Sequence, residues 1–392
     1  MDRSTRRRVP AGARLVPWIA IASLVLVAAS YVVNAMDRQV FPVVLPSINK
    51  EYGFSLQAGG LLSTIFTLGI GLAGIPSGYL LDRFSRKTVM LVGIGIYSVF
   101  TLLTALSQGF GDMFVYRAFS GVGEAMHNAA LFSAVGAYFF ANRSLALGSL
   151  NFAYGLGGYI GPQLGAHLAG GGWRTPFYTY AGIGIFMAIL IVLFIRASFS
   201  EQREVPPDIS RAAALDHVPG RVINRNIVLL AIAAAVIGLA MYGFIGLYPT
   251  FLETQLHLTQ AQAGMGASMF GLGVAGCFVG YFIFNGPTDA GGQYALAFCE
   301  GAIASGFCFV NVYSAMQRAV RPEMVGRASG LFVASFYIPS AFAGYLFSAL
   351  VGSVGWGGAG LVQLTLIPIV AVVVLFFVRP SRFSNAKAVS AG

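Results

Sequence analysis

Charged residues are scarce in this chain of 392 residues: they make up 10% of it, whereas hydrophobic residues make up 57%. A soluble globular domain carries about 25% charged residues, so this composition excludes an ordinary soluble protein. The mean hydropathy of +0.75 is that of a chain that crosses a membrane many times. The net charge of +10 therefore does not indicate a nucleic-acid-binding protein.

Cysteines and the usual catalytic motifs are scarce as well. The three cysteines, Cys277, Cys299 and Cys308, lie in apolar segments without the spacing of a disulfide framework or a metal site,. The sequence contains no phosphate-binding G-x-x-x-x-G-K-[ST] loop, which argues against ATP-driven transport. No Ser-His-Asp set stands out, so we expect neither an enzyme nor a cofactor or bound metal.

Long apolar runs predict transmembrane helices, because about 20 apolar residues cross a bilayer. The fold is therefore expected to be all-α, with two pseudo-symmetric helical bundles. The polar segment 198–225, rich in Pro, Arg and Glu, separates an N-terminal bundle of six helices (1–197) from a C-terminal bundle (226–392). The expected spans number about 11 and cover roughly 16–46, 57–81, 88–107, 112–139, 144–168, 175–196, 227–250, 262–284, 292–317, 326–350 and 358–378.

Basic residues predict which side of the membrane each loop occupies, because cytoplasmic loops are enriched in Lys and Arg. Most of the 24 basic residues lie in 1–14, 83–87, 196–225, 318–327 and 379–387. The loops of the opposite side contain only Lys50 and Arg174. We therefore expect cytoplasmic termini, a cytoplasmic linker and a location in the inner membrane of a bacterial-type cell.

Ionisable residues inside a span are costly, and by default they mark a functional site. The predicted spans contain Asp37, Arg38, Arg117, Glu124 and Glu300. A spacing of seven residues places Arg117 and Glu124 on one face of a helix, and His127 follows on that face. Buried ion pairs with a purely structural role are the alternative reading.

Other polar and aromatic side chains are candidates for the wall of a central cavity that binds substrate. Packing between helices is the alternative for each aromatic residue. The candidates are Tyr31, Asn34, Arg38, His127, Asn151, Tyr154, Tyr242, Glu300 and Tyr337.

Residues 78–87, with the sequence GYLLDRFSRK, lie between two long apolar segments. Their pattern G-x-x-x-D-R-x-x-R-K resembles the signature loop between the second and third helices of the major facilitator superfamily of secondary transporters. Ser85 stands where that family has glycine. The resemblance implies that the acid and the bases bind neighbouring helix ends and hold the cytoplasmic side closed. The matching residues are Gly78, Asp82, Arg83, Arg86 and Lys87.

Residues 155–165 resemble the glycine–proline motif of the fifth helix of that family. The matching residues are Gly157, Gly161, Pro162 and Gly165. The glycines permit close helix packing, and the proline frees a backbone carbonyl so that the helix can bend. A tightly packed helix without any bending is the alternative.

Asp37-Arg38 in the first span, together with R-x-x-x-G-x-G-E-A over residues 117–125, resembles the spinster-like and organic-anion symporter branches of the superfamily. That resemblance implies that Asp37 and Glu124 carry protons. It also implies that Arg117 is their switchable partner.

The two halves look like diverged repeats, since the segment 66–69 (FTLG) has a counterpart in 270–273 (FGLG). The spacing between corresponding segments shrinks along the chain by about one helix. The basic segment 318–327 is expected in the cytoplasm, so the span 292–317 must begin on the outer side of the membrane. The span 262–284 begins on the same side, which is impossible if it crosses the membrane only once. We therefore expect that one helix of the C-terminal half, of the ninth type, is missing, or that 262–291 is re-entrant.

These patterns predict a monomeric transporter that moves a small organic solute by alternating access, coupled to protons, with the bilayer as its surroundings. Arg117 favours a carboxylate as the substrate. One alternative is an exporter of amphiphiles, lipids or drugs. Another is a degenerate chain that transports nothing, because of the missing helix.

Overall fold

The computed structural model describes residues 15–139, 143–201, 219–272, 289–301, 309–321, 324–379 and 381. These residues form helices and connecting turns without any strand, which confirms the all-α prediction. The prediction of about eleven spans with one helix missing depends on residues 273–288 and 302–308, which lie outside the described residues.

Six helical stretches of the described residues are long and apolar enough to cross a membrane. They are Pro17–Tyr52, Leu56–Leu81, Arg86–Ala105, Thr175–Phe194, Arg225–Thr254 and Arg327–Phe376. This finding agrees with a protein that crosses the membrane several times.

The N-terminal half contains α1 (Pro17–Tyr52), α2 (Leu56–Thr64), α3 (Phe66–Arg83), α4 (Arg86–Ala105), α5 (Phe110–Tyr138), α6 (Arg143–Leu168), the short 3₁₀ turn η3 (Ala169–Gly171), α7 (Thr175–Phe194) and α8 (Ala197–Ser200). The C-terminal half contains α9 (Arg225–Thr254), α10 (Gln260–Leu272), α12 (Ala290–Gly301), α13 (Val310–Arg318), α14 (Val325–Ser340), α15 (Ala343–Gly360), the π-helical turn η8 (Leu361–Leu366) and α16 (Ile367–Phe376).

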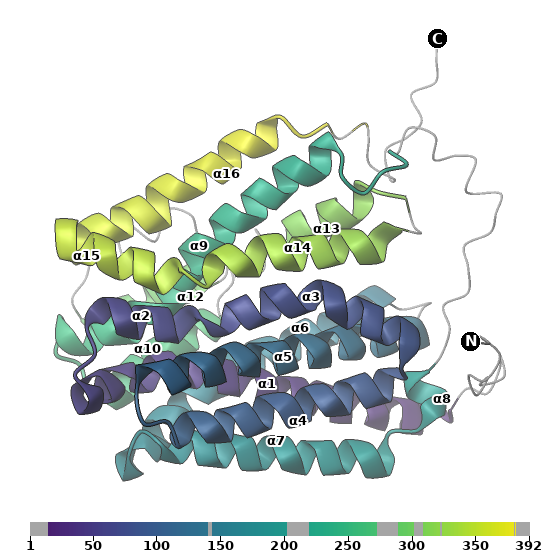
Figure 1. Cartoon of the computed structure of the whole chain (residues 1–392), viewed down its shortest axis with the longest axis horizontal. Coiled ribbons are helices and arrows are strands. Elements are labelled where there is room, and N and C mark those ends of the chain that lie inside the picture. Colours follow the sequence, from purple (N-terminus) through teal and green to yellow (C-terminus); the bar gives the residue numbers. More distant parts are fainter. Residues whose placement is uncertain are drawn as a thin grey trace.

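The helices run roughly along the longest axis of the molecule, with the N-terminal half in the lower part of Figure 1 and α9, α14, α15 and α16 above it. Within the N-terminal half, α1 packs along α6, and α5 packs against both α3 and α4. The halves meet where α3 contacts α14, α6 contacts α10, and α2 contacts α15. Hydrogen bonds between side chains link α1 to α4 and to α5 within the N-terminal half.

Local sequence explains where several of these helices begin and end. Ser55 and Ser85 precede α2 and α4, and each hydroxyl accepts a hydrogen bond from a backbone N–H of the first turn,. The helix α1 ends at Gly53, which has a φ of 67°, a conformation that glycine adopts without steric cost.

The crossing of α3 and α5 depends on two glycines. A side chain at Gly121 would collide with the carbonyl oxygen of Phe66, and one at Gly69 would collide with the carbonyl oxygen of Ala118. The two backbones therefore approach more closely than larger residues would allow. This approach holds Phe66 beside the charged residues of α5.

We predict that Gly121→Ala destabilises the protein by about 1–3 kcal/mol, because a methyl group at this crossing overpacks it. Gly95→Ala in α4 is the matched control, since a side chain there meets no atom within 4 Å. The thermal unfolding midpoint of the purified protein in detergent is the measurement. Equal midpoints for the two variants would contradict this account of the crossing.

Candidate functional site

Four charged side chains are buried together in the interior of the N-terminal half. Asp37 and Arg38 come from α1 and are 1% and 2% exposed, and Arg117 and Glu124 come from α5 and are 1% and 0% exposed. Charged residues are almost never fully buried unless they are paired. This cluster is therefore the candidate functional site.

Glu124 forms an ion pair with Arg38 across the contact between α5 and α1. Its Oε2 lies 2.6 Å from Nη2 of Arg38 and accepts a second hydrogen bond of 2.8 Å from Nε. The family resemblance implied Arg117 as the partner, but the structure instead pairs Glu124 with Arg38. The reason is geometric: seven residues of rise along α5, about 10 Å, separate Arg117 from Glu124, whereas α1 places Arg38 directly opposite.

The guanidinium of Arg117 is held by aromatic rings. Its Cζ lies 4.4 Å from the ring centroid of Phe41 and 4.9 Å from that of Phe66. Cation–π contacts of this kind stabilise a buried cation. Its Nε and Nη2 have no hydrogen-bond partner, so the edge of the guanidinium formed by these two nitrogens, whose geometry suits a carboxylate, is unused.

Asp37 occupies the contact between α1 and α4. Its Oδ2 accepts a hydrogen bond of 2.7 Å from the hydroxyl of Thr101, while its Oδ1 has no partner. Because the chain retains this second buried acceptor without a partner, the carboxyl group is able to bond a further donor or to take up a proton.

His127 lies one turn beyond Glu124 and is fully buried. Its Nε2 is 3.0 Å from the hydroxyl oxygen of Ser30 in α1. Its ring contacts those of Tyr31 and Tyr97, with centroids 6.3 Å and 6.0 Å away. The prediction that His127 belongs to the same face as Glu124 thus agrees with its position in the cluster.

The other predicted cavity residues fall into three groups. Asn34 and Tyr154 contact Arg38, at 3.5 Å from Nη2 and 3.4 Å from Nη1. Tyr242 and Tyr337 belong to the C-terminal half, with ring centroids 6.0 Å apart. Asn151 is exposed on α6 and does not join the buried cluster, and the side chain of Glu300 lies outside the described residues.

Sequence reasoning missed several residues that shape the site. Tyr97 and Thr101 are spaced by four on an apolar helix, a polar stripe that could have been noticed. Phe41 and Phe66 gave no signal, because they are two of 32 phenylalanines. The ring of Phe66 also lies 5.9 Å from that of Tyr242, so it links the charged cluster to the C-terminal half.

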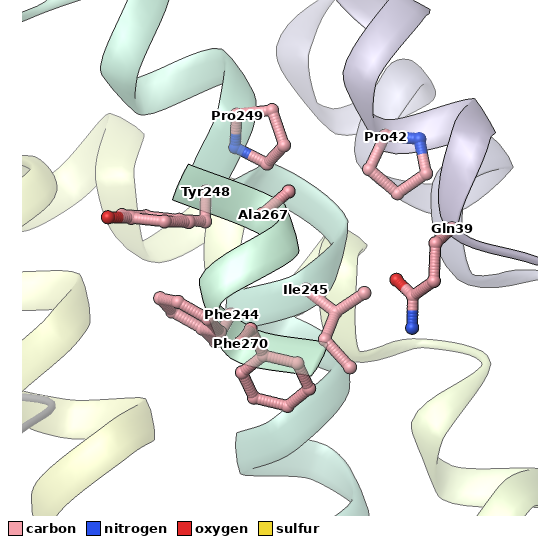
Figure 2. Close-up of a pocket in the computed structure, with 8 residues that line it drawn as sticks. All are labelled: Gln39, Pro42, Phe244, Ile245, Tyr248, Pro249, Ala267 and Phe270. Atoms are coloured by element: carbon pink, nitrogen blue, oxygen red, sulfur yellow. The ribbon is translucent and has the colours of Figure 1, made fainter. Parts of the chain in front are cut away.

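A small pocket between α1, α9 and α10 adjoins this region (Figure 2). Gln39 and Pro42 of α1 face Ile245 and Pro249 of α9 there. The wall is almost entirely apolar and aromatic, and Gln39 supplies its amide. The complete lining is Gln39, Pro42, Phe244, Ile245, Tyr248, Pro249, Ala267 and Phe270.

In the signature loop, the backbone N–H groups of Arg86 and Lys87 each donate a 3.2 Å hydrogen bond to the carboxylate of Glu201. The Nζ of Lys87 donates to the carbonyls of Val192 and Ile195 at the end of α7, at 2.9 Å and 2.6 Å. These contacts join the loop to α7 and to Glu201 at the start of the segment 198–225, and they cap α4 and α7.

The remaining loop residues make fewer contacts. Arg83 lies 4.3 Å above the ring of Tyr79, and Gly78 is exposed with open space around it. The side chain of Asp82 lies outside the described residues. The role of this loop in closing the cytoplasmic side stays a prediction.

The glycines of α6 lie against α1. A side chain at Gly157 would collide with the carbonyl of Val32, and one at Gly161 would meet the backbone of Met36. Gly165 lies against the side chain of Val40. Pro162 is inside the continuous helix α6, so bending at this residue stays a prediction.

Within the described ranges, no group of three or more His, Cys, Asp or Glu side chains is placed to hold a metal ion. The charged cluster contains two carboxyl groups and two guanidinium groups.

Comparison with known proteins agrees with this architecture. A sequence model described as the Major Facilitator Superfamily matches residues 27–288. The chain is 29% identical to the "Protein spinster" of Drosophila melanogaster over 216 residues, which is 54% of this chain and 35% of that protein. It is 26% identical over 286 residues to the "Probable L-galactonate transporter" of Escherichia coli K12, covering 70% of this chain and 63% of that protein.

A solved structure is similar over almost the whole chain. It is a bacterial homologue of the human lysosomal transporter spinster in an inward-facing, unoccupied conformation, with a TM-score of 0.67 and 18% sequence identity. The match covers 94% of this chain and 97% of that one, and it shows a shared fold. The chain spans less than two thirds of the length of both curated relatives named above.

We predict that Arg38→Leu destabilises the protein by about 3–5 kcal/mol at pH 8, because it leaves the carboxylate of Glu124 buried without its partner. The double variant Arg38→Leu/Glu124→Leu should recover most of this loss. Thermal unfolding in detergent is the measurement.

The control is Arg174→Leu, which removes a partner from the half-exposed pair with Glu51 (2.7 Å). Arg174 donates to both carboxylate oxygens of Glu51, to Tyr52 and to the carbonyl of Ala105. Because Arg174 and Glu51 are half-exposed and the charge left behind is solvated, this variant should destabilise the protein less than Arg38→Leu. A double variant no more stable than Arg38→Leu alone would show that the buried charge is not the cause.

Proposed function

Because the chain belongs to the major facilitator superfamily, a family of membrane transporters and not of enzymes, we propose that it moves a small organic anion across a membrane together with protons. The expected bundles, 1–197 and 226–392 joined by 198–225, would rock about a central site and expose it to each side in turn. The proposed location is the inner membrane of a bacterial cell, with both termini in the cytoplasm.

The observation that carries the anion proposal is the buried guanidinium of Arg117. Two of its nitrogens, Nε and Nη2, have no hydrogen-bond partner, and its described contacts are with the rings of Phe41 and Phe66. A desolvated guanidinium attracts a carboxylate strongly and bonds it through two parallel hydrogen bonds. The relative named for L-galactonate, a carboxylate, supports this substrate class.

Proton coupling follows from the second guanidinium. While Glu124 is charged, it neutralises Arg38 through the 2.6 Å ion pair. When Glu124 takes up a proton, that neutralisation ends, and the cluster gains one positive charge. A substrate anion then compensates this charge, so anion and proton favour each other's binding and travel in the same direction.

A second candidate is an anionic amphiphile, which the apolar pocket of Figure 2 favours. Phe244 stacks on Tyr248 with centroids 4.4 Å apart, and Phe270 lies 5.3 Å from Phe244. An aromatic wall of this kind suits an apolar group of the substrate. The similarity to spinster is compatible with this candidate.

The test is uptake by proteoliposomes under an inward proton gradient, with L-galactonate, an aromatic carboxylate and a lysophospholipid as probes. We predict that Arg117→Gln lowers uptake at least tenfold, since removal of a charge-assisted hydrogen bond costs about 1.5–3 kcal/mol. The exposed Arg225→Gln is the matched control and should leave uptake unchanged.

We further predict that Glu124→Gln abolishes proton-driven accumulation but preserves exchange of the substrate across the membrane without a gradient, because a glutamine cannot release a proton. Transport of the lysophospholipid alone would select the second candidate. If the folded protein moved none of the probes, both candidate substrates would be contradicted, and the result would support the alternative of a chain that transports nothing.

A further inference from the structure

Glu124 and His127 are neighbours on one face of α5, and each has one polar atom without a hydrogen-bond partner. Both side chains are fully buried. The unpartnered atoms are Oε1 of Glu124 and Nδ1 of His127. Side chains three residues apart on a helix lie side by side, and buried polar atoms are otherwise nearly always bonded.

The two contacts of Ser30 favour one tautomer of His127. Its hydroxyl has a single hydrogen, which it donates to the carbonyl of Val27 at 2.7 Å. The same oxygen can then only accept from Nε2 of His127 at 3.0 Å. In the neutral ring Nε2 therefore carries the hydrogen, and Nδ1 presents a lone pair that accepts.

A charged Glu124 and this form of His127 cannot bond each other, because a carboxylate also only accepts. This explains why both atoms stay unpartnered while Glu124 is paired with Arg38. A protonated Glu124 gains one O–H donor, and the acceptor one turn away is free to receive it.

We propose that His127 is the acceptor for the protonated form of Glu124, so that this side chain bonds Arg38 when it is charged and His127 when it is neutral. The inference rests on the proposed coupling to protons and names the residue that governs it. On loading, one proton joins a carboxylate oxygen, the ion pair with Arg38 ends, and an O–H···Nδ1 bond forms. His127 stays neutral throughout, and release reverses each step.

Other titratable and charged groups surround this pair and enter the test. Asp37 is the other acid, and Tyr97 is the other donor near His127, since its hydroxyl has no partner. The described groups within reach are Tyr31, Asp37 and Arg38 of α1, Tyr97 of α4, Arg117 of α5, Tyr154 of α6, Tyr242 of α9 and Tyr337 of α14.

The first measurement is the pH of half-maximal proton-driven uptake in proteoliposomes. We predict that His127→Leu shifts this pH downward by roughly half to one unit, the size expected when the neutral acid loses one hydrogen bond. His127→Gln should shift it less, because its amide oxygen still accepts. The matched control is His167→Leu at the exposed end of α6, with no shift.

A second measurement needs no transport. Infrared difference spectra of the purified protein follow the carboxyl band that Glu124→Gln removes, and the midpoint of its pH titration should shift downward in His127→Leu. Tyr97→Phe should leave the midpoint unchanged. If the wild type shows no uptake but this midpoint shifts, the proposed function fails while the role of His127 stands.

The opposite result overturns the inference. An unchanged infrared midpoint in His127→Leu, with normal uptake by the wild type, would show that Glu124 does not use this acceptor. A shift of the infrared midpoint in Tyr97→Phe, with no shift in His127→Leu, would also show that Glu124 does not use His127 as its acceptor. An infrared carboxyl band whose midpoint still shifts when His127→Leu is added to Glu124→Gln would assign the effect to Asp37 and equally refute the proposal.

Discussion

The ion pair between Arg38 and Glu124 is the interaction on which the rest of the N-terminal half depends. Both groups are buried, and a buried charge whose partner is removed destabilises a protein strongly. The pair therefore fixes how α1 and α5 lie relative to each other, since a displacement by one residue would turn either group away. Asp37 with Thr101 and His127 with Ser30 add two further links between α1 and its neighbours in the same register.

Close backbone contacts make this arrangement possible. Gly121 lets α5 approach α3, and Gly93 lets α4 approach α5 beside His127. Small residues at such crossings bring polar side chains from three helices within bonding distance, without the spacing that larger residues would impose. The aromatic rings of Phe41 and Phe66 then lie against the guanidinium of Arg117, where their π faces stabilise the cation.

The two halves differ in chemistry where they meet. The buried ion pair and the unpaired guanidinium belong to the N-terminal half, whereas the facing part of the C-terminal half is aromatic, with Tyr242, Phe336 and Tyr337 in contact. Between the halves, Thr64 donates to the carbonyl of Ala341 at 2.8 Å. Further hydrogen bonds cross the interface from Ser63 to the carbonyl of Gly246 at 2.9 Å, and from the N–H of Gly344 to Thr64 at 3.4 Å.

The sequence by itself determined the class of protein and the charged residues of the site. Scarcity of charge and long apolar runs are local properties, and they predict membrane helices without any knowledge of packing. Asp37, Arg38, Arg117 and Glu124 could be found for the same reason, because a charge within an apolar span is conspicuous wherever its partner lies. The signature loop and the family likewise follow from residues that are close in the chain.

Only the tertiary structure decided which of these residues bond each other. Arg38 and Glu124 are 86 residues apart in sequence, and nothing local distinguishes Arg38 from Arg117 as the partner. The exposure of Asn151 and the place of Phe66 depend in the same way on the rotation of each helix about its own axis. That rotation is set by neighbouring helices, through glycine contacts and buried polar bonds. The sequence of a single apolar span therefore does not predict it.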